Sequence, residues 1–289
     1  MDTETDVTFA EAGGLELKLD IYPPRGESLR AAIIYLHGGG WRGGSREAMR
    51  PAAKSMADRG YVGLPAQYRL TGQSPWPAQI HDVKAAIRWT RANADRLGVD
   101  PDRIVLWGSS AGAHLALLAA GTPNDPAFEG DVGPMGVSSA VAVVIAVHPP
   151  TGFKLGDAGP RHGADATALM GAAATVEGAA AAGPLSHVSE TFPPTLLLHG
   201  TQDRVVHHSA SQEMLDALRA ARAPADLHLF HGHNHGFAAL PSMREVLSAE
   251  AAYFLDRTLI DPAKYAAEIE QFSMFAGGRA PGAPAPQPA

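Results

Sequence analysis

A serine stands at the centre of a G-x-S-x-G pentapeptide at 108–112. A short apolar run, 104–107, precedes it, and an apolar stretch typical of a helix follows it. A serine on a sharp strand-to-helix turn has a strained backbone and an exposed hydroxyl, and the flanking glycines let strand and helix approach closely. Ser110 is therefore the candidate nucleophile. The alternative is an ordinary Gly/Ser turn at the start of a helix, because five-residue patterns recur by chance.

An acid and a base for this serine follow it in the chain. Asp203 comes just after the apolar run 195–198, and His235 lies in the loop after the run 226–230. A carboxylate just past the carboxyl end of a buried strand lies at the same sheet edge as a serine that follows a parallel strand. The order serine, acid, histidine predicts a nucleophile, a carboxylate that orients the base, and a base that takes the proton.

Three histidines, His231, His233 and His235, alternate in that loop. His235, which is followed by Gly-Phe, is the preferred base, and the other two are expected to be solvated or at the mouth of the pocket. In a second interpretation the three bind a metal together with His207 or His208. The glycines make the loop irregular, and a metal site would leave the serine motif without a role, so no metal is expected.

A glycine-rich loop, His37-Gly38-Gly39-Gly40-Trp41, directly follows the apolar run 31–36. Glycines let backbone N–H groups form a concavity that binds an oxyanion. The candidate donors are the N–H groups of Gly39 and Gly40, together with that of Ala111. Four neighbouring side chains are candidates for substrate binding: His37, Trp41, Tyr68 and Ser109.

The same loop formally matches a dinucleotide fingerprint, because Gly38, Gly40 and Gly43 have its spacing. That fold also needs an acidic residue at the end of the next strand to hold the ribose. The next apolar run is followed by Gln67-Tyr68-Arg69 instead. No dinucleotide, and no other cofactor, is therefore expected.

Short apolar runs alternate with longer amphipathic segments, which predicts a mostly parallel sheet with helices on both faces. About eight strands are expected, at 7–9, 15–21, 31–36, 61–66, 104–107, 141–147, 195–198 and 226–230. The first two would form a hairpin across Gly13-Gly14. The expected helices are 46–59, 77–97, 111–120, 209–222 and 243–258.

Two regions depart from this alternation. Residues 151–190 are rich in Ala and Gly and would form a small lid insertion within a catalytic domain of residues 1–260. Apolar side chains at helical spacing (Tyr265, Ile269, Phe272 and Phe275) predict a last helix, 261–276, that packs on the body. The Pro/Ala tail 277–289 is expected to be disordered.

Composition narrows the class of protein. The chain has 289 residues, a net charge of −7 and no cysteine, which argues against nucleic-acid binding and excludes disulfides and thiolate chemistry. The acidic start lacks a signal-peptide pattern, and the longest apolar run, 140–147, is too short to span a membrane. A cytoplasmic protein without a membrane partner is expected, and the sequence gives no oligomeric state.

With these motifs in hand, the sequence resembles the α/β-hydrolase superfamily, and most closely its bacterial esterase/lipase branch of the acetyl-xylan and feruloyl esterase-like type. The resemblance covers about 15–259 and rests on four motifs: the loop 37–41, the segment 108–115, His199-Gly200-x-x-Asp203 and His235-Gly236-Phe237.

The expected activity is therefore hydrolysis of short-chain, above all acetyl, esters of a small molecule through Ser110, His235 and Asp203. Two alternatives stay open. One is an amide or formamide hydrolase, such as an arylformamidase, that uses the same residues. The other is a binding protein of the same fold without turnover.

Overall fold

The computed structural model describes residues 2–159 and 163–272, which are built around a sheet of eight strands in the order β1-β2-β4-β3-β5-β6-β9-β10. The first pairs, β1 with β2 and β2 with β4, are antiparallel, and all later neighbours are parallel. The strands are β1 (Glu4–Ala12), β2 (Leu15–Ile21), β3 (Ala32–Leu36), β4 (Val62–Ala66), β5 (Ile104–Ser109), β6 (Val143–Val147), β9 (Thr195–Gly200) and β10 (Ala225–Phe230).

The central strands are buried along their whole length. Every residue of β3, β4, β6 and β9 is buried. Strands covered on both faces have continuous apolar runs rather than alternating ones, which is why these segments could be located in the sequence. The predicted α/β fold with a mostly parallel sheet is confirmed.

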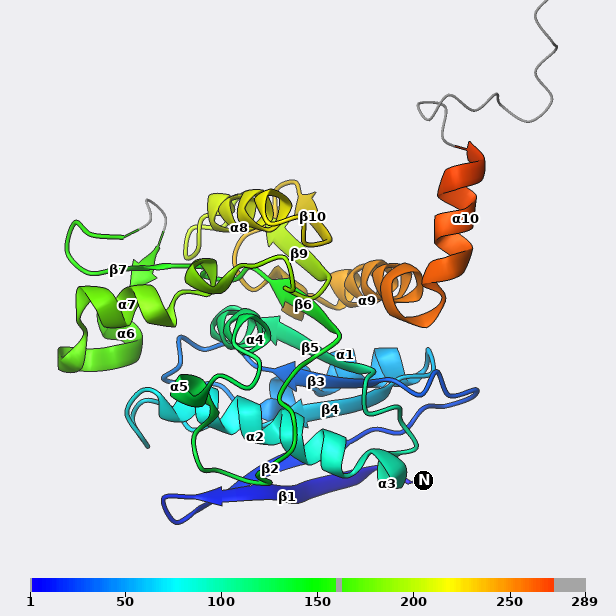
Figure 1. Cartoon of the computed structure of the whole chain (residues 1–289), viewed down its shortest axis with the longest axis horizontal. Helices are drawn as coiled ribbons and strands as arrows, with labels where there is room; N and C mark the ends of the chain where they lie inside the picture. The colour runs from blue at the N-terminus through cyan, green and yellow to red at the C-terminus, as the bar shows by residue number, and fades with distance from the viewer. Residues whose placement is uncertain (1, 160–162, 273–289) are drawn as a thin grey trace, which may run out of the picture.

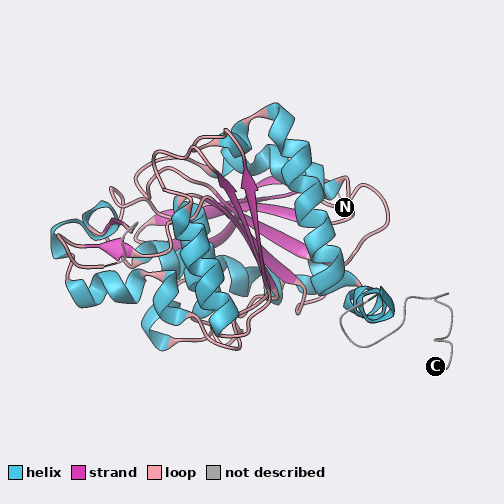
Figure 2. Cartoon of the chain, turned by 90° about the horizontal axis from the view of Figure 1, so that it is seen from above, coloured by secondary structure: helices cyan, strands magenta, loops and turns pink. Residues whose placement is uncertain are grey.

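Helices cover both faces of the sheet (Figure 2). One face packs against α1 (Arg50–Ala57) and α9 (Pro241–Leu255). The other packs against α2 (Ala78–Ala92), α4 (Ala111–Gly121) and α8 (Ser209–Ala220). The short helices α3 (Ala94–Leu97) and α5 (Pro126–Glu129) complete this layer. Across the described ranges, no helix combines the length and the apolar character that crossing a membrane requires.

Two predicted helices differ in detail. The expected helix 77–97 is divided at Asn93 into α2 and α3. The expected helix 46–59 begins as a 3-10 turn, Arg46–Met49, before α1.

The segment 151–190 forms a small substructure of its own. It contains the two-stranded parallel sheet of β7 (Phe153–Lys154) and β8 (Ala164–Asp165), followed by α6 (Thr167–Met170) and α7 (Val176–Ala182). Figure 1 shows these elements gathered at one end of the molecule, opposite the end from which α10 projects.

The last helix, α10 (Pro262–Phe272), does not pack on the body as predicted. It points away from the sheet (Figure 1), none of its residues is buried, and Ile269 and Phe272 are 68% and 66% exposed. A hydrogen bond from the Tyr265 hydroxyl to Asp256 ties its first turn to the chain before it. The prediction was wrong because helical spacing of apolar side chains defines a face without showing what covers it. Phe275 and the tail 277–289 lie outside the described residues.

A buried ion pair joins the chain after β4 to α2. The Arg69 guanidinium donates to both carboxylate oxygens of Asp82, at 2.8 and 2.7 Å, and the Arg69 backbone N–H donates to the same carboxylate. Burial raises the pKa of Asp82, although the hydrogen bonds from Arg69 oppose this effect. The pair fixes the segment that begins with Tyr68 against the helix layer.

We expect Asp82→Asn to lower the free energy of unfolding by about 3–5 kcal/mol, because it leaves the Arg69 charge buried without a counter-charge. Urea unfolding followed by circular dichroism measures this change. The matched control is Glu4→Gln, which removes one partner of the exposed Arg96–Glu4 pair and should cost less than about 1 kcal/mol. Equal losses of unfolding free energy in the two variants would contradict the structural role of the buried pair.

Candidate active site

Ser110 occupies the tight turn between β5 and α4. Its backbone dihedrals, φ 52° and ψ −117°, are unusual for a residue with a side chain and cost of order 1–3 kcal/mol. The flanking glycines are required by close contact: a Cβ on Gly108 would lie 2.3 Å from the Gly112 carbonyl oxygen, and one on Gly112 would lie 2.2 Å from the Leu36 carbonyl oxygen. The pentapeptide therefore forms the strained turn that the sequence predicted.

Ser110, His235 and Asp203 form a hydrogen-bonded row. The His235 Nε2 atom lies 3.0 Å from the Ser110 Oγ atom, and the His235 Nδ1 atom lies 2.7 Å from the Asp203 Oδ2 atom. A carboxylate only accepts, so Nδ1 carries the proton of the neutral ring and Nε2 is free to accept the serine proton. The structure thus brings together all three residues proposed from the sequence.

Asp203 is held by four donors. Its Oδ1 atom accepts the backbone N–H groups of Val205 and Val206, both at 2.9 Å, and its Oδ2 atom lies within reach of His235 and, at 3.3 Å, of His199. Burial alone would raise the pKa of Asp203, but the hydrogen bonds from the two histidines and the backbone outweigh it and hold the pKa well below its usual range. Asp203 is therefore a carboxylate at any working pH.

His148 is a neighbour of this row that the sequence analysis missed. Its ring centroid lies 4.1 Å from that of His235, and its Nε2 atom lies 3.4 Å from the Ser109 Oγ atom. Burial, together with the nearby His235 and His199, lowers the pKa of His148 to about 3, so its ring is neutral. A signal existed, since His148 directly follows β6, as Asp203 follows β9 after a short turn.

The glycine-rich loop lies directly against Ser110. A Cβ on Gly38 would come within 3.2 Å of the Ser110 Cβ atom, so the loop and the serine turn touch at a glycine. Gly39 and Gly40 have positive φ values of 122° and 60°. Within the described ranges, the N–H groups of Gly39, Gly40 and Ala111 donate to no other backbone or side-chain group. They remain available to a ligand.

Three of the four predicted substrate-binding side chains are buried beneath this loop instead of facing a cavity, which corrects that expectation. His37 and Tyr68 stack with ring centroids 4.3 Å apart, and the Tyr68 hydroxyl donates to the His37 carbonyl at 2.8 Å. Trp41 is also buried, and its indole N–H donates to His114 Nδ1 at 3.2 Å. Ser109 does border a cavity.

His114, one turn into α4, connects three parts of the site. It accepts from Trp41, and its Nε2–H donates to the Ala182 carbonyl of α7 at 2.9 Å. Burial lowers the pKa of His114 to about 4, so it is neutral and can both accept and donate. The imidazole of His114 therefore links the glycine-rich loop, α4 and the insertion.

The alternative metal site is not assembled. Within the described residues, the group of potential ligands close enough to share an ion is His148, Asp203 and His235, with ligand atoms within 4.8 Å of one another. His231 is exposed, and His233 packs against Phe237, with ring centroids 5.5 Å apart. The three alternating histidines therefore do not converge, and His235 is already engaged by Asp203 and Ser110.

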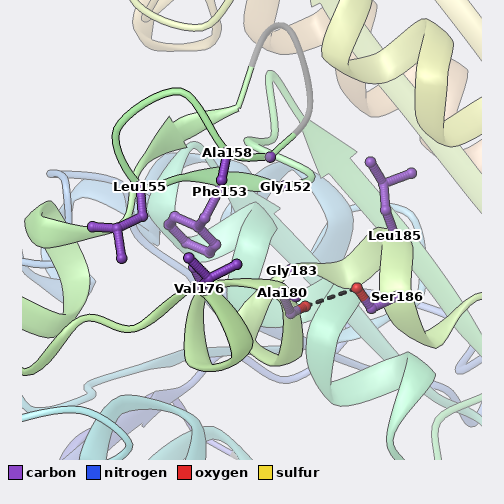
Figure 3. Close-up of a pocket in the computed structure, with 11 residues that line it drawn as sticks. Gly152, Phe153, Leu155, Ala158, Val176, Ala180, Gly183, Leu185 and Ser186 are labelled. Atoms are coloured by element: carbon purple, nitrogen blue, oxygen red, sulfur yellow. Dashed lines mark hydrogen bonds between the residues drawn. The ribbon is translucent and has the colours of Figure 1, made fainter.

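Two cavities lie near this site. One, of about 310 Å³, is lined by Gly38, Ser109 and Gly236 among others, which are direct chain neighbours of Gly39, Ser110 and His235. The other, of about 290 Å³, lies in the insertion, where Phe153 and Val176 point toward one another across it (Figure 3). Phe153 also contacts the ring of Trp41, with centroids 5.6 Å apart, so the second cavity adjoins the base of the glycine-rich loop.

Comparisons with known proteins show which family the chain belongs to. The sequence model of the BD-FAE family matches residues 19–218, a span that contains the glycine-rich loop, Ser110 and Asp203 and ends before His235. Esterase 2 of Thermogutta terrifontis, solved in a form phosphoramylated by tabun, has a TM-score of 0.76 and 29% sequence identity, over 88% of this chain and 93% of that chain.

Two curated relatives come from Mycobacterium tuberculosis. Esterase LipC is 32% identical over 245 residues, which are 82% of this chain and 60% of LipC. Esterase LipQ is 35% identical over 254 residues, which are 83% of this chain and 58% of LipQ. The chain thus spans about three fifths of the length of these relatives. The predicted resemblance is confirmed: the chain has the α/β-hydrolase fold and belongs to the BD-FAE family.

Proposed function

We propose that the protein is a serine hydrolase of carboxylic esters with short acyl groups, acetyl above all. The observation that carries the proposal is the hydrogen-bonded row from Asp203 through His235 to Ser110, at 2.7 and 3.0 Å. This row gives a serine hydroxyl on a strained turn both a base in the correct tautomer and a carboxylate that fixes that tautomer.

The reaction follows in two halves. Ser110 Oγ attacks the ester carbonyl carbon while His235 Nε2 takes its proton; the tetrahedral intermediate then collapses, and the same proton passes to the leaving alcohol. Water attacks the acyl-enzyme with His235 again as base, which releases the carboxylic acid and restores the serine. Asp203 stays ionised throughout and stabilises the imidazolium that forms in each half.

The developing oxyanion would be bound by backbone donors. The N–H groups of Gly39, Gly40 and Ala111 have no acceptor among the described residues; Ala111 follows Ser110 in the chain, and the glycine-rich loop touches Ser110 at Gly38. Ala111 also begins α4, whose N-terminal dipole favours negative charge at this position.

Two observations support short acyl groups. The cavity that Ser109 lines, next to Ser110, is small, at about 310 Å³. In addition, the Thermogutta esterase 2 has been solved with propionate bound, and its structure has a TM-score of 0.75 to this one.

The test is hydrolysis of p-nitrophenyl acetate, butyrate and octanoate by the wild type and by Ser110→Ala. We expect kcat/KM to fall with chain length and kcat of the variant to fall by at least about 10⁴-fold, because the nucleophile is lost. Thermal unfolding of the variant serves as the control for folding. Undiminished activity of Ser110→Ala would contradict the proposal, and inactivity toward all three esters with turnover of N-formylkynurenine would replace it by formamide hydrolysis.

His235→Ala should reduce kcat to within about tenfold of the Ser110→Ala value, because members of such a row act as a unit. His233→Ala is the matched control, since this histidine lies in the same loop and packs against Phe237 instead of facing Ser110. Steady-state kinetics on p-nitrophenyl acetate compares the two. If His233→Ala were inactive and His235→Ala active, His235 would not be the base.

The two loop glycines should respond differently to alanine. A Cβ on Gly39 would lie 2.2 Å from the Gly43 carbonyl oxygen, whereas one on Gly40 meets nothing within 4 Å. Gly39→Ala must displace the loop and should lower kcat by about 10²–10³-fold, the effect of losing an oxyanion donor. Gly40→Ala should cost about 1–2 kcal/mol of stability for its positive φ but keep kcat within about tenfold. Similar kinetic losses in both variants would contradict this geometry.

A further inference from the structure

The cavity beside Ser109 contains an unusual pair of polar groups. It lies between α1 and α9, on the face of the sheet opposite α4, and most of its wall is apolar, including Met49, Trp107 and Leu247. Among the described residues that line it, Arg244 is the only one that carries a charge. The cavity is lined by Ser109, the residue before Ser110, so a substrate held at Ser110 can extend into it.

The Arg244 guanidinium has no partner among the described residues. No hydrogen bond or ion pair of this side chain is formed with the described part of the chain, whereas the next residue, Glu245, is paired with Arg59. Arg244 is the fourth residue of α9, where the helix dipole disfavours a cation. Neither a salt bridge nor the helix therefore accounts for an arginine at the wall of this cavity.

Ser248 supplies a second, independent observation. It is 1% exposed, it lines the same cavity, and its Oγ atom has no hydrogen-bond partner among the described residues. A buried hydroxyl without a partner costs free energy, which a ligand atom would recover. Ser248 follows Arg244 by one helical turn, so both side chains lie on the same side of α9.

We propose that this cavity binds a carboxylate carried by the substrate, so that the preferred esters have a short apolar segment ending in a carboxylate. A guanidinium binds a carboxylate through two parallel hydrogen bonds, and the Ser248 hydroxyl can donate a third. The apolar wall accepts the carbon atoms between the carboxylate and the ester. The carboxylate takes no part in bond breaking, and the inference rests on the ester hydrolysis proposed above.

The test compares acids with their neutral methyl esters, with the carboxylate on either side of the scissile bond. Monomethyl and dimethyl adipate place it in the acyl group, and 6-acetoxyhexanoic acid and its methyl ester place it in the alcohol. Methanol or acetate release is followed by NMR. We expect the wild type to prefer the acid by about tenfold in kcat/KM in at least one pair, and the preference to weaken with added salt.

Arg244→Gln should lower this acid-to-ester ratio by about tenfold, to near 1, because the charge-assisted hydrogen bonds to the carboxylate are lost, and it should do so chiefly through KM. Arg244→Lys should keep part of the preference, because it keeps the charge but loses the two-pronged geometry. Ser248→Ala should lower the ratio by only a few fold. The matched control is Arg219→Gln, an exposed arginine of α8 outside the cavity, which should leave the ratio unchanged.

A second measurement does not depend on whether the variants fold. Adipate should inhibit p-nitrophenyl acetate hydrolysis by the wild type competitively and more strongly than the neutral adipamide. Equal inhibition, equal hydrolysis of acid and ester in both pairs, or an Arg244→Gln ratio equal to that of the wild type would each overturn the inference. If neutral esters are still hydrolysed and Ser110→Ala is inactive, the ester hydrolase function stands and only the carboxylate site fails.

Discussion

The positive φ of Ser110 is a strained conformation that the surrounding backbone enforces. β5 and α4 meet so closely that Gly108 and Gly112 have no room for a Cβ atom, and α4 lies against the carboxyl end of β3 at Leu36. The glycine-rich loop begins at that same strand end and touches the serine at Gly38. Because three glycines permit this contact, Ser110 and the proposed oxyanion donors come from the ends of two adjacent parallel strands. The packing of the buried sheet around the turn offsets the free-energy cost of this strained backbone conformation.

Around this turn, buried hydrogen-bonded side chains hold the loops in place. Tyr68 and His37 lie beneath the glycine-rich loop, and Trp41 joins it to His114. On the other side, His199 accepts from the Ser211 hydroxyl through Nδ1, at 2.7 Å, and its Nε2 faces the Val206 carbonyl and Asp203. Each group is buried and satisfied, and such networks fix geometry because breaking any member leaves a polar atom without a partner.

Much of this could be predicted from the sequence, for reasons visible in particular residues. The apolar runs of β3, β5 and β9 are continuous because both faces are covered, and the polar residues that follow such runs, Ser110 and Asp203, necessarily share one edge of the sheet. The burial of Tyr68 and the pairing of Arg69 with Asp82 depend on which distant segments pack together, and no local pattern encodes that. His148 also follows a buried strand directly, so the same reasoning could have identified it, but the sequence analysis did not. For α10, the spacing of Ile269 and Phe272 predicted the helix correctly but carried no information about its surroundings.

The buried neutral histidines also link folding to proton uptake. His114 and His148 have pKa values of about 4 and about 3 in the folded protein, whereas an unfolded chain protonates its histidines near pH 6.5. Below that pH the unfolded state binds a proton at His114 and another at His148, and the folded state does not. Each of these two sites therefore lowers the free energy of unfolding by about 1.4 kcal/mol per pH unit until its folded pKa is reached. Acidification below pH 6.5 therefore lowers the free energy of unfolding through His114, which links the glycine-rich loop to α4, and through His148, which lies beside His235.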